Sequence, residues 1–222
     1  MITKVRPARP GLLRVCAHVT GAPDLTGLRI LLVCDLLLRA AELRRLQVIT
    51  VLASEGETAE LERAADALGI HPPAARARPG QCGPADVHLA AHDADSGGGL
   101  VVRVGAARGP QGDDPLAVRL ALIELPWHEP ADLTEAALAG ARETLRQWRR
   151  LVAEWARSPS RPMPPTVAEQ IKAALGDLDT VSVLALLRDL ASDESVPPGA
   201  RFETFVYADR VLALELPREI GT

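Results

Sequence analysis

Residues 12–43, LLRVCAHVTGAPDLTGLRILLVCDLLLRAAEL, decide the expected fold. Residues 12–19 are a short apolar run, which is typical of a buried parallel strand. A turn with Gly21 and Pro23 follows, and from Leu25 to about residue 45 apolar side chains recur at the spacing of a helix with a wide buried face. A strand that leads directly into a helix is the first half of a βαβ unit, so the chain is expected to open with an α/β layer.

The following segments continue this alternation. Residues 46–53 predict a second strand, and residues 57–69 predict an amphipathic helix that ends at a glycine. Residues 71–86 are rich in Pro, Ala, Arg and Gly and predict an irregular connection. Two further strands are predicted after it, at residues 86–92 and 100–105. Alternating strands and helices predict a small parallel Rossmann-like sheet.

The second half of the chain has a helical pattern only. Pro115 follows acidic residues, which favours a helix start there, and Thr134 is placed to cap a long helix. A Pro- and Ser-rich linker at 157–165 precedes two more helical segments, at 166–192 and about 200–214. The predicted organisation is therefore an α/β domain at residues 1–110 and a helical bundle at residues 111–222.

Composition limits the classes of function. No run of about 18 apolar residues and no signal-peptide pattern is present, so we expect a cytoplasmic protein without a membrane span. The three cysteines form no CxxC pair, which favours isolated thiols over a disulfide framework or a ribbon-type zinc site. Residues 1–110 hold 13 Lys and Arg against 11 Asp and Glu, and residues 111–222 hold 12 against 18. The acidic second half disfavours nucleic acid as a partner, because that affinity comes from neutralised phosphates.

Three strings follow one another in the helical half. They are DDPLAVRLALIELPWHEPADLTEAALAGARETLRQWRRLV (113–152), ALGDLDTVSVLALLRDLAS (174–192) and FETFVYADRVLALEL (202–216). In this order they resemble the exit from the catalytic domain and the DALR-type helical domain of cysteinyl-tRNA synthetases, with Asp177, Asp179 and Thr180 at a family motif. The cysteine ligase of mycothiol synthesis shares this ancestry. The resemblance implies a HUP-type Rossmann-like sheet followed by a DALR-type bundle.

By the same alignment, PDLTGLR (23–29) takes the place of the family's signature turn, P-H-x-G-H-x-R, whose histidines contact ATP. Asp24 and Gly27 stand where the family has histidines. A carboxylate at this point repels phosphates, and we expect Asp24 or Thr26 to cap the helix instead. The family's lysine loop is also missing: its place holds GAARGPQGDD (105–114), where Arg108 is no simple substitute for a compact ammonium group.

The resemblance also implies a zinc site that recognises a cysteine thiolate. Cys16 matches its first ligand and His88 aligns with a family histidine, but the family's H-H-E-N-E segment has no counterpart. One matched ligand does not hold zinc, so Cys16 and His88 remain metal candidates without a predicted metal, and His88 and His92 are interpreted as structural or surface residues. We therefore expect neither ATP nor zinc as a cofactor.

These substitutions, in a chain much shorter than the synthetases, lead to the hypothesis of a truncated, degenerate and non-catalytic relative, a pseudoenzyme. It would act through a protein partner or bind a small ligand in the crevice at the carboxyl ends of its strands. An alternative is a compact cysteine or aminoacyl ligase or transferase that still binds a nucleotide. A third is a tRNA-binding module, which the acidic half disfavours. The candidate nucleotide-binding residues are Asp24, Thr26, Gly27, Arg29, Arg103 and Arg108.

Overall fold

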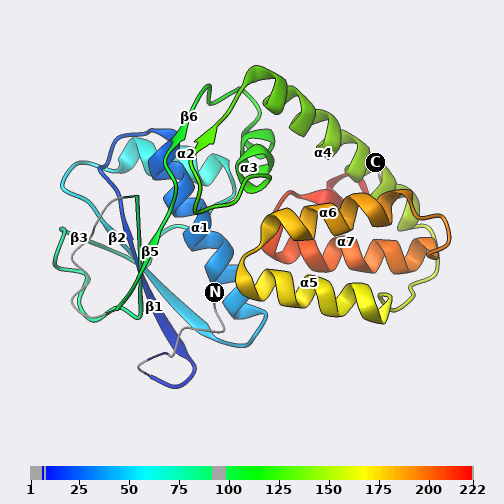
Figure 1. Ribbon diagram of the computed structural model, residues 1–222, viewed down its shortest axis with the longest axis horizontal. Coiled ribbons are helices and arrows are strands. Elements are labelled where there is room, and N and C mark those ends of the chain that lie inside the picture. Colours follow the sequence, from blue (N-terminus) through cyan, green and yellow to red (C-terminus); the bar gives the residue numbers. More distant parts are fainter. Residues whose placement is uncertain (1–6, 8, 92–98, 222) are drawn as a thin grey trace.

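A parallel sheet of five strands forms the N-terminal half of the protein, in a computed structural model that describes residues 7, 9–91 and 99–221 (Figure 1). The strand order is β3-β2-β1-β4-β5. The bounds are β1 Leu12–His18, β2 Gln47–Ala53, β3 Ala75–Ala77, β4 Val87–Ala90 and β5 Leu100–Arg103. Because β1 pairs with β2 on one side and with β4 on the other, the strand order reverses at β1, and a ligand crevice is expected at the carboxyl ends of these strands.

The helix α1 (Leu25–Glu42) lies between the sheet and the helices of the second half (Figure 1). Only Thr26, Arg39 and Glu42 of this helix are not buried. It contacts β1, β2 and β4 as well as α5 and α7, and a helix that is covered on two sides must be apolar nearly all round. The shorter α2 (Ala59–Ala67) packs beside α1 and contributes to the same core.

The two faces of the sheet have different surroundings. On β1, Val15 and its neighbours of the same parity join α1 and α2 in the main core. Strand residues i and i+2 share a face, so Cys16 and His18 both lie on the opposite face. There a separate small cluster is formed by Cys16, Val51, Ala53 and Cys82. The sheet therefore turns its chemically reactive side chains away from α1.

The second half is helical. Its helices are α3 Pro115–Ile123, α4 Glu135–Trp155, α5 Pro165–Asp177, α6 Thr180–Ser192, α7 Pro198–Leu212 and a short 3-10 helix η2, Leu216–Glu219. The carboxylate of Asp114 caps α3 by accepting two backbone N–H bonds, and the hydroxyl of Thr134 caps α4. A two-stranded parallel sheet, β6 (Ala107–Arg108) with β7 (Ala131–Asp132), lies next to the start of α1.

Arg119 on α3 joins the two halves. It is fully buried, and its guanidinium donates to Asp35 Oδ2 on α1 at 2.7 Å, to Leu68 O after α2 at 3.0 Å and to Leu212 O on α7 at 2.6 Å. One main core cluster extends from Leu13 on β1 to Leu216 in η2. The α/β half and the helical half are thus packed against each other over a continuous apolar core.

The predicted α/β layer followed by helices is confirmed, including Pro115 in a first turn and Thr134 as a cap. Three details of the prediction are wrong. Residues 71–86 contain β3, and the helical segment 166–192 is two helices that break at Leu178, which has a φ of 55°. The second half is not helical throughout, because β7 lies between α3 and α4. The division at residue 110 stays a prediction. In the described part of the chain, no helix is both long enough and apolar enough to cross a membrane.

Candidate functional site

Three side chains with metal-binding atoms meet on the sheet face that points away from α1. The register places Cys16 on β1 beside His88 on β4, and His18 follows two residues after Cys16. His18 Nε2 and His88 Nδ1 are 2.9 Å apart. The Cys16 sulfur and one ring nitrogen of each histidine all lie within 4.8 Å of one another. Cys16 and His88 are buried and His18 is half-buried, so the cluster meets solvent mainly through His18.

A fourth donor comes from the loop that precedes β4. Cys82 lies between Gly80 and Gly83, which adopt φ values of 74° and 66°, and its sulfur is bonded to that of Cys16. The interpretation of three isolated thiols is therefore wrong for this pair, whereas Cys34 is a free, buried thiol. We name the set Cys16, His18, Cys82 and His88 the Cys/His cluster.

The Cys/His cluster fits a zinc ion when its disulfide is reduced. Two thiolates and two imidazoles form one of the usual tetrahedral zinc donor sets. The sequence argument against zinc was that only one ligand matched the family. In the structure, His18 and Cys82 lie beside Cys16 and His88, so four candidate ligands are close together and that argument no longer applies. In the disulfide form the two sulfurs are not thiolates and do not ligate a metal. His92, the other histidine that the sequence analysis considered beside His88, lies outside the described residues.

The backbone at Gly99 sets the position of the His88 ring. A Cβ at residue 99 would lie 2.8 Å from His88 Cδ2 and would collide with the carbonyl oxygen of Ala85. Only a residue without a side chain leaves room for the imidazole at this point. The start of β5 therefore helps to direct His88 towards His18.

A cavity of about 450 Å³ lies beside the cluster, at the carboxyl ends of β1, β2 and β4. It is lined by His18, Val19, Thr20, Asp24, Thr26, Gly27, Ile30, Ala53, Glu55, Pro79, Gly80, Ala90, Ala91 and Ala106. His18 belongs both to this crevice and to the Cys/His cluster. Among the described residues that line it, the crevice has two carboxylates, Asp24 and Glu55, and neither lysine nor arginine. Its charge favours an amine over a phosphate.

The start of α1 forms one wall of the crevice. Asp24 is the N-cap, and its Oδ1 accepts the N–H of Gly27 at 2.7 Å. The hydroxyl of Thr26 donates to the carbonyl of Ala107 at 3.1 Å and accepts the N–H of the same residue at 3.0 Å. Asp24, Thr26 and Gly27 thus lie together at the crevice, and the expected helix cap is confirmed with Asp24 as the capping residue. The carboxylate of Asp24 accepts the hydrogen bond of a helix N–H that would otherwise be available to an anionic ligand.

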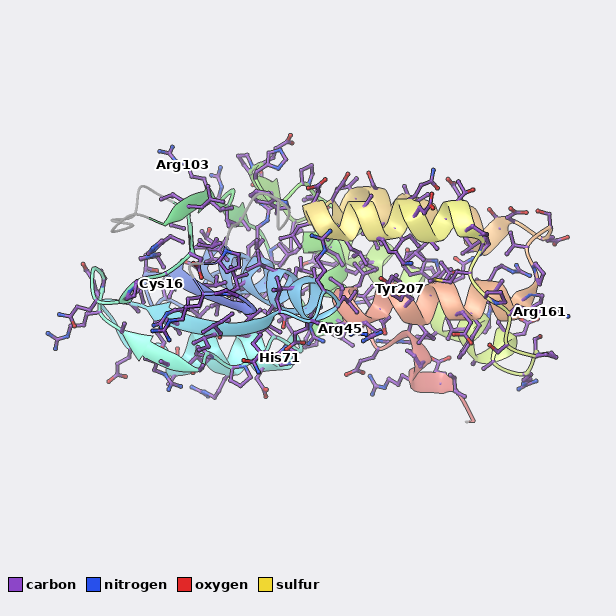
Figure 2. All side chains as sticks on the ribbon, turned by 90° about the horizontal axis from the view of Figure 1, so that it is seen from below. Cys16, Arg45, His71, Arg103, Arg161 and Tyr207 are labelled. Carbon is purple, nitrogen blue, oxygen red and sulfur yellow. A yellow bond between two sulfur atoms is a disulfide. The ribbon has the colours of Figure 1, made fainter. Side chains whose placement is uncertain are left out.

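The three candidate arginines do not line this crevice. Arg29 is buried and donates to the main-chain carbonyls of Gly105, Pro126 and Glu129, so its role is to hold the loop around β7. Burial lowers the pKa of Arg29, and the nearby Glu129 partly offsets this. Arg108 is exposed and lies 3.6 Å from Asp132, while Arg103 extends from the outer side of β5 (Figure 2). The structure does not bring these arginines together into a phosphate site.

His18 and Cys82 were missed by the sequence analysis. The signal for His18 was present, because Cys16 and His18 are two residues apart on a predicted strand and must share a face. Cys82 falls in a segment that was expected to be irregular, and its approach to β1 depends on the path of the loop. No sequence pattern gives that path.

Comparisons with known proteins give partial matches. No family model matches the chain. The L-cysteine:1D-myo-inositol 2-amino-2-deoxy-alpha-D-glucopyranoside ligase of Kribbella flavida is 31% identical over 106 residues, which cover 47% of this chain and 25% of the ligase. The ligase of the same name from Streptomyces griseus is 33% identical over 90 residues, which cover 40% of this chain and 21% of the ligase. The chain is distantly similar to a cysteine ligase. It spans a quarter or less of the length of these relatives, and the matches support a class I synthetase-like relationship.

Proposed function

We propose that the protein is a non-catalytic, synthetase-like module that binds a small thiol-bearing amine, of the chemical class of cysteine, in the crevice beside the Cys/His cluster. The main observation behind this proposal is that His18 both lines the crevice and belongs to the Cys/His cluster. A ligand that enters the crevice therefore meets the cluster directly. The names of the similar ligases include L-cysteine, which agrees with a thiol-bearing ligand.

The charges of the crevice support an amine ligand. Asp24 and Glu55 line the cavity, and either carboxylate is a suitable partner for an ammonium group. A thiolate, in contrast, needs a positive or metal partner, and the cluster is the place where one would be held. If a zinc ion is bound by Cys16, Cys82, His18 and His88, its four tetrahedral positions are filled, so it would act as a Lewis acid on a ligand thiolate only where that thiolate replaces one protein ligand. His18 is the ligand that the crevice would reach, because it is half-buried and lines the cavity. The protein side chains then select a molecule that carries both groups.

The same lining supports the non-catalytic part of the proposal. Stabilisation of the transition state of adenylate formation requires positive charge or N–H donors at the phosphates of ATP. No lysine or arginine lines the crevice in the part of the chain that the structure describes, and the N–H of Gly27 is already bound by Asp24. Its two carboxylates would repel a triphosphate. ATP therefore lacks the partners that it would need in this cavity.

Isothermal titration of the reduced, zinc-supplemented protein with cysteine, with ATP and with a non-hydrolysable cysteinyl-adenylate mimic tests the proposal. We expect binding of cysteine, weaker binding after His18→Ala, and no heat with ATP. His128→Ala is the matched control, because His128 is exposed and lies outside the crevice. Pyrophosphate release with ATP and cysteine would instead establish a compact ligase and overturn the non-catalytic assignment.

The absence of heat with all three compounds would overturn ligand binding at this crevice. The search for function would then turn to a protein partner, with a pull-down on the full chain. A salt-dependent shift of tRNA in a gel would revive nucleic-acid binding, which the excess of acidic residues over residues 111–222 opposes.

A further inference from the structure

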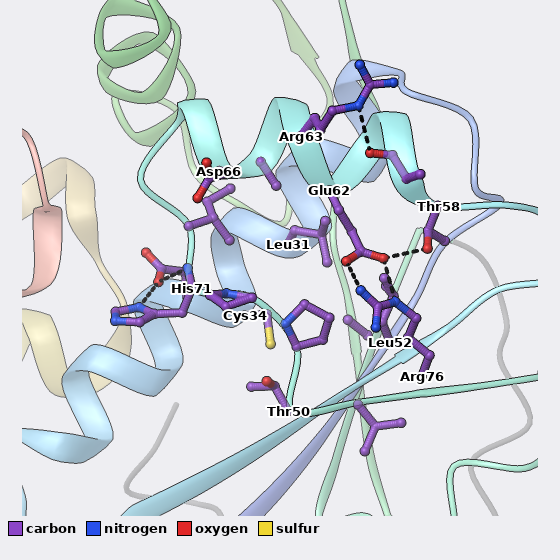
Figure 3. A pocket seen from close by; sticks show the side chains of 18 of the residues that line it. Leu31, Cys34, Thr50, Leu52, Thr58, Glu62, Arg63, Asp66, His71 and Arg76 are labelled. Atoms are coloured by element: carbon purple, nitrogen blue, oxygen red, sulfur yellow. Dashed lines mark hydrogen bonds and ion pairs between the residues drawn. The ribbon is translucent and has the colours of Figure 1, made fainter.

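A second and larger cavity, of about 780 Å³, lies on the helix-covered side of the sheet between α1, α2 and β2 (Figure 3). None of its lining residues lines the crevice beside the Cys/His cluster. We name it the α1/α2 cavity. Its volume is within the range of about 300–1,000 Å³ that is usual for sites that bind small molecules. It therefore requires an explanation separate from the proposed function.

The interior of the α1/α2 cavity is apolar. Its walls include the buried side chains of Leu31, Leu38, Leu52, Ala65 and Ile70. Cys34 also lines it, and burial, followed by repulsion from Asp35, raises the pKa of this thiol to about 12. The thiol is therefore neutral at physiological pH and offers no charge to a ligand. The part of a ligand that enters this interior must be hydrocarbon.

Several charged groups at the rim are already paired. Glu62 binds both Nε and Nη2 of Arg76, and it accepts a hydrogen bond from the hydroxyl of Thr58 at 2.6 Å (Figure 3). The hydrogen bond from Arg76 lowers the pKa of Glu62, so this pair remains charged on both sides. Asp35 is bound by Arg119, Arg39 and His71. Glu62 and Arg76 neutralise each other, and the carboxylate of Asp35 is fully compensated by its two arginines, so neither acidic group is available to select a ligand by charge.

Two carboxylates at the rim differ from these. Glu57 and Asp66 line the cavity and make no ion pair within the described part of the chain, whereas Arg63, the remaining cation of the lining, faces Glu60 at 3.7 Å. The uncompensated charge of the rim is therefore negative. A ligand with a positive head group is attracted to this rim, and one with a negative head group is repelled.

We propose that the α1/α2 cavity binds an apolar organic cation, an alkyl or aryl amine whose hydrocarbon part fills the interior and whose ammonium group stays at the acidic rim. The apolar walls provide most of the affinity, because they remove hydrocarbon surface from water. Glu57 and Asp66 provide the preference for the charge of the head group. Both are exposed, so this preference is expected to be about three- to tenfold.

Three probes with the same chain separate these two contributions: octylamine, octanol and octanoate. Titration followed by calorimetry or by protein NMR shifts should give the tightest binding for octylamine and the weakest for octanoate. Glu57→Gln and Asp66→Asn, made separately and together, should reduce the advantage of octylamine and leave octanol binding unchanged. Glu154→Gln is the matched control, because this exposed residue of α4 lies far along the chain and outside the cavity.

A substitution that fills the cavity tests its location. Ala65→Trp should abolish the binding of octylamine and octanol alike, and His18→Ala should leave both unchanged because His18 belongs to the other cavity. Equal affinity for octylamine and octanoate would overturn the cation preference. Absence of octylamine binding to the parent protein, or its persistence in a folded Ala65→Trp protein, would overturn the site. The rim substitutions keep the proposal testable if Ala65→Trp does not fold.

Discussion

The guanidinium of Arg119 has no contact with solvent and holds Asp35, Leu68 and Leu212 together from three different parts of the chain. Removing one member of a buried ion pair leaves the other charge without full compensation, which is strongly destabilising. Arg119→Met is therefore expected to lower the free energy of unfolding by about 3–5 kcal/mol. Denaturant unfolding measures the difference.

Arg146→Met is the matched control for this substitution. Arg146 forms an ion pair with Glu143 one turn earlier on α4, but both side chains are largely exposed. Exposed pairs contribute about 1 kcal/mol or less. If Arg119→Met were no more destabilising than Arg146→Met, the buried network would not be what holds the two halves together.

The charge of Asp35 gives the stability of the protein a dependence on pH. Burial alone would raise the pKa of Asp35, but the attraction of Arg119 and Arg39 and the hydrogen bonds from Arg119 and His71 outweigh it and leave the pKa lowered. A carboxyl group with a lowered folded pKa stabilises the protein above its unfolded pKa of about 3.9, and this contribution is lost as the pH falls through the folded value.

Asp35→Asn should therefore be less stable than the parent at neutral pH, and the difference should shrink below about pH 4. Unfolding in denaturant at neutral and acidic pH, for both proteins, measures this difference directly. A difference that stays constant over the whole range would mean that packing of the carboxyl group, and not its charge, is the source of the stabilisation.

At the scale of one element, Asp24 fixes the start of α1. Its carboxylate accepts the N–H of Gly27, and α1 is the helix on which both halves pack. Asp24→Ala should lower the free energy of unfolding by about 1 kcal/mol, whereas Asp24→Asn keeps an acceptor at the cap and should lose much less. Thermal or denaturant unfolding of the two variants checks this. Equal losses would show that the negative charge at the helix start matters more than the hydrogen bond.

The elements with strong hydrophobic patterns were predictable from the sequence. The wide apolar face of α1, Pro115 in the first turn of α3 and the cap at Thr134 are local signals, and the structure follows them. The three residues of β3 include no large apolar side chain, so the segment has no strand signal. Leu178 ends α5 in the left-handed region without the glycine that usually marks such an end. The break between α5 and α6 in segment 166–192 could therefore not be predicted from the sequence.

The candidate site was predictable only in part. A crevice at the start of α1 follows from a parallel α/β sheet whose first strand leads into a helix, and the sequence indicates both, whereas the strand order comes only from the structure. The Cys/His cluster depends on contacts between His18 and His88, which are 70 residues apart, and between Cys16 and Cys82, which are 66 apart. Such contacts arise from tertiary packing, and a local pattern does not contain them.

For the whole molecule, the two cavities lie at different places on one sheet. The crevice lies at the carboxyl ends of the strands, with the start of α1 as one wall and the Cys/His cluster beside it, and the α1/α2 cavity lies on the face that α1 and α2 cover. Because no lining residue is shared, a substitution in one cavity is not expected to remove binding in the other. This separation is what makes the ligand experiments on each cavity independent.

The oxidation state of Cys16 and Cys82 decides whether the Cys/His cluster can bind a metal ion. As a disulfide, the pair leaves the two histidines as the remaining donors, which is fewer than a zinc site needs. Two-electron reduction by an added thiol or phosphine releases both sulfurs as ligands. We expect the reduced protein to bind one Zn²⁺ or Co²⁺ per chain and the oxidised protein to bind none. Ligand-field absorption of Co²⁺ measures the binding.

Thermal unfolding provides an independent measure of the same event. Metal present at about 100 times its dissociation constant should add about 2.7 kcal/mol to the stability of the reduced protein. Cys82→Ser should remove both the absorption and the added stability, whereas Cys34→Ala should keep them, because Cys34 lies in the other cavity. Metal binding that survives either oxidation or Cys82→Ser would show that the ion is held elsewhere, and the crevice would then bind its amine ligand without help from a metal.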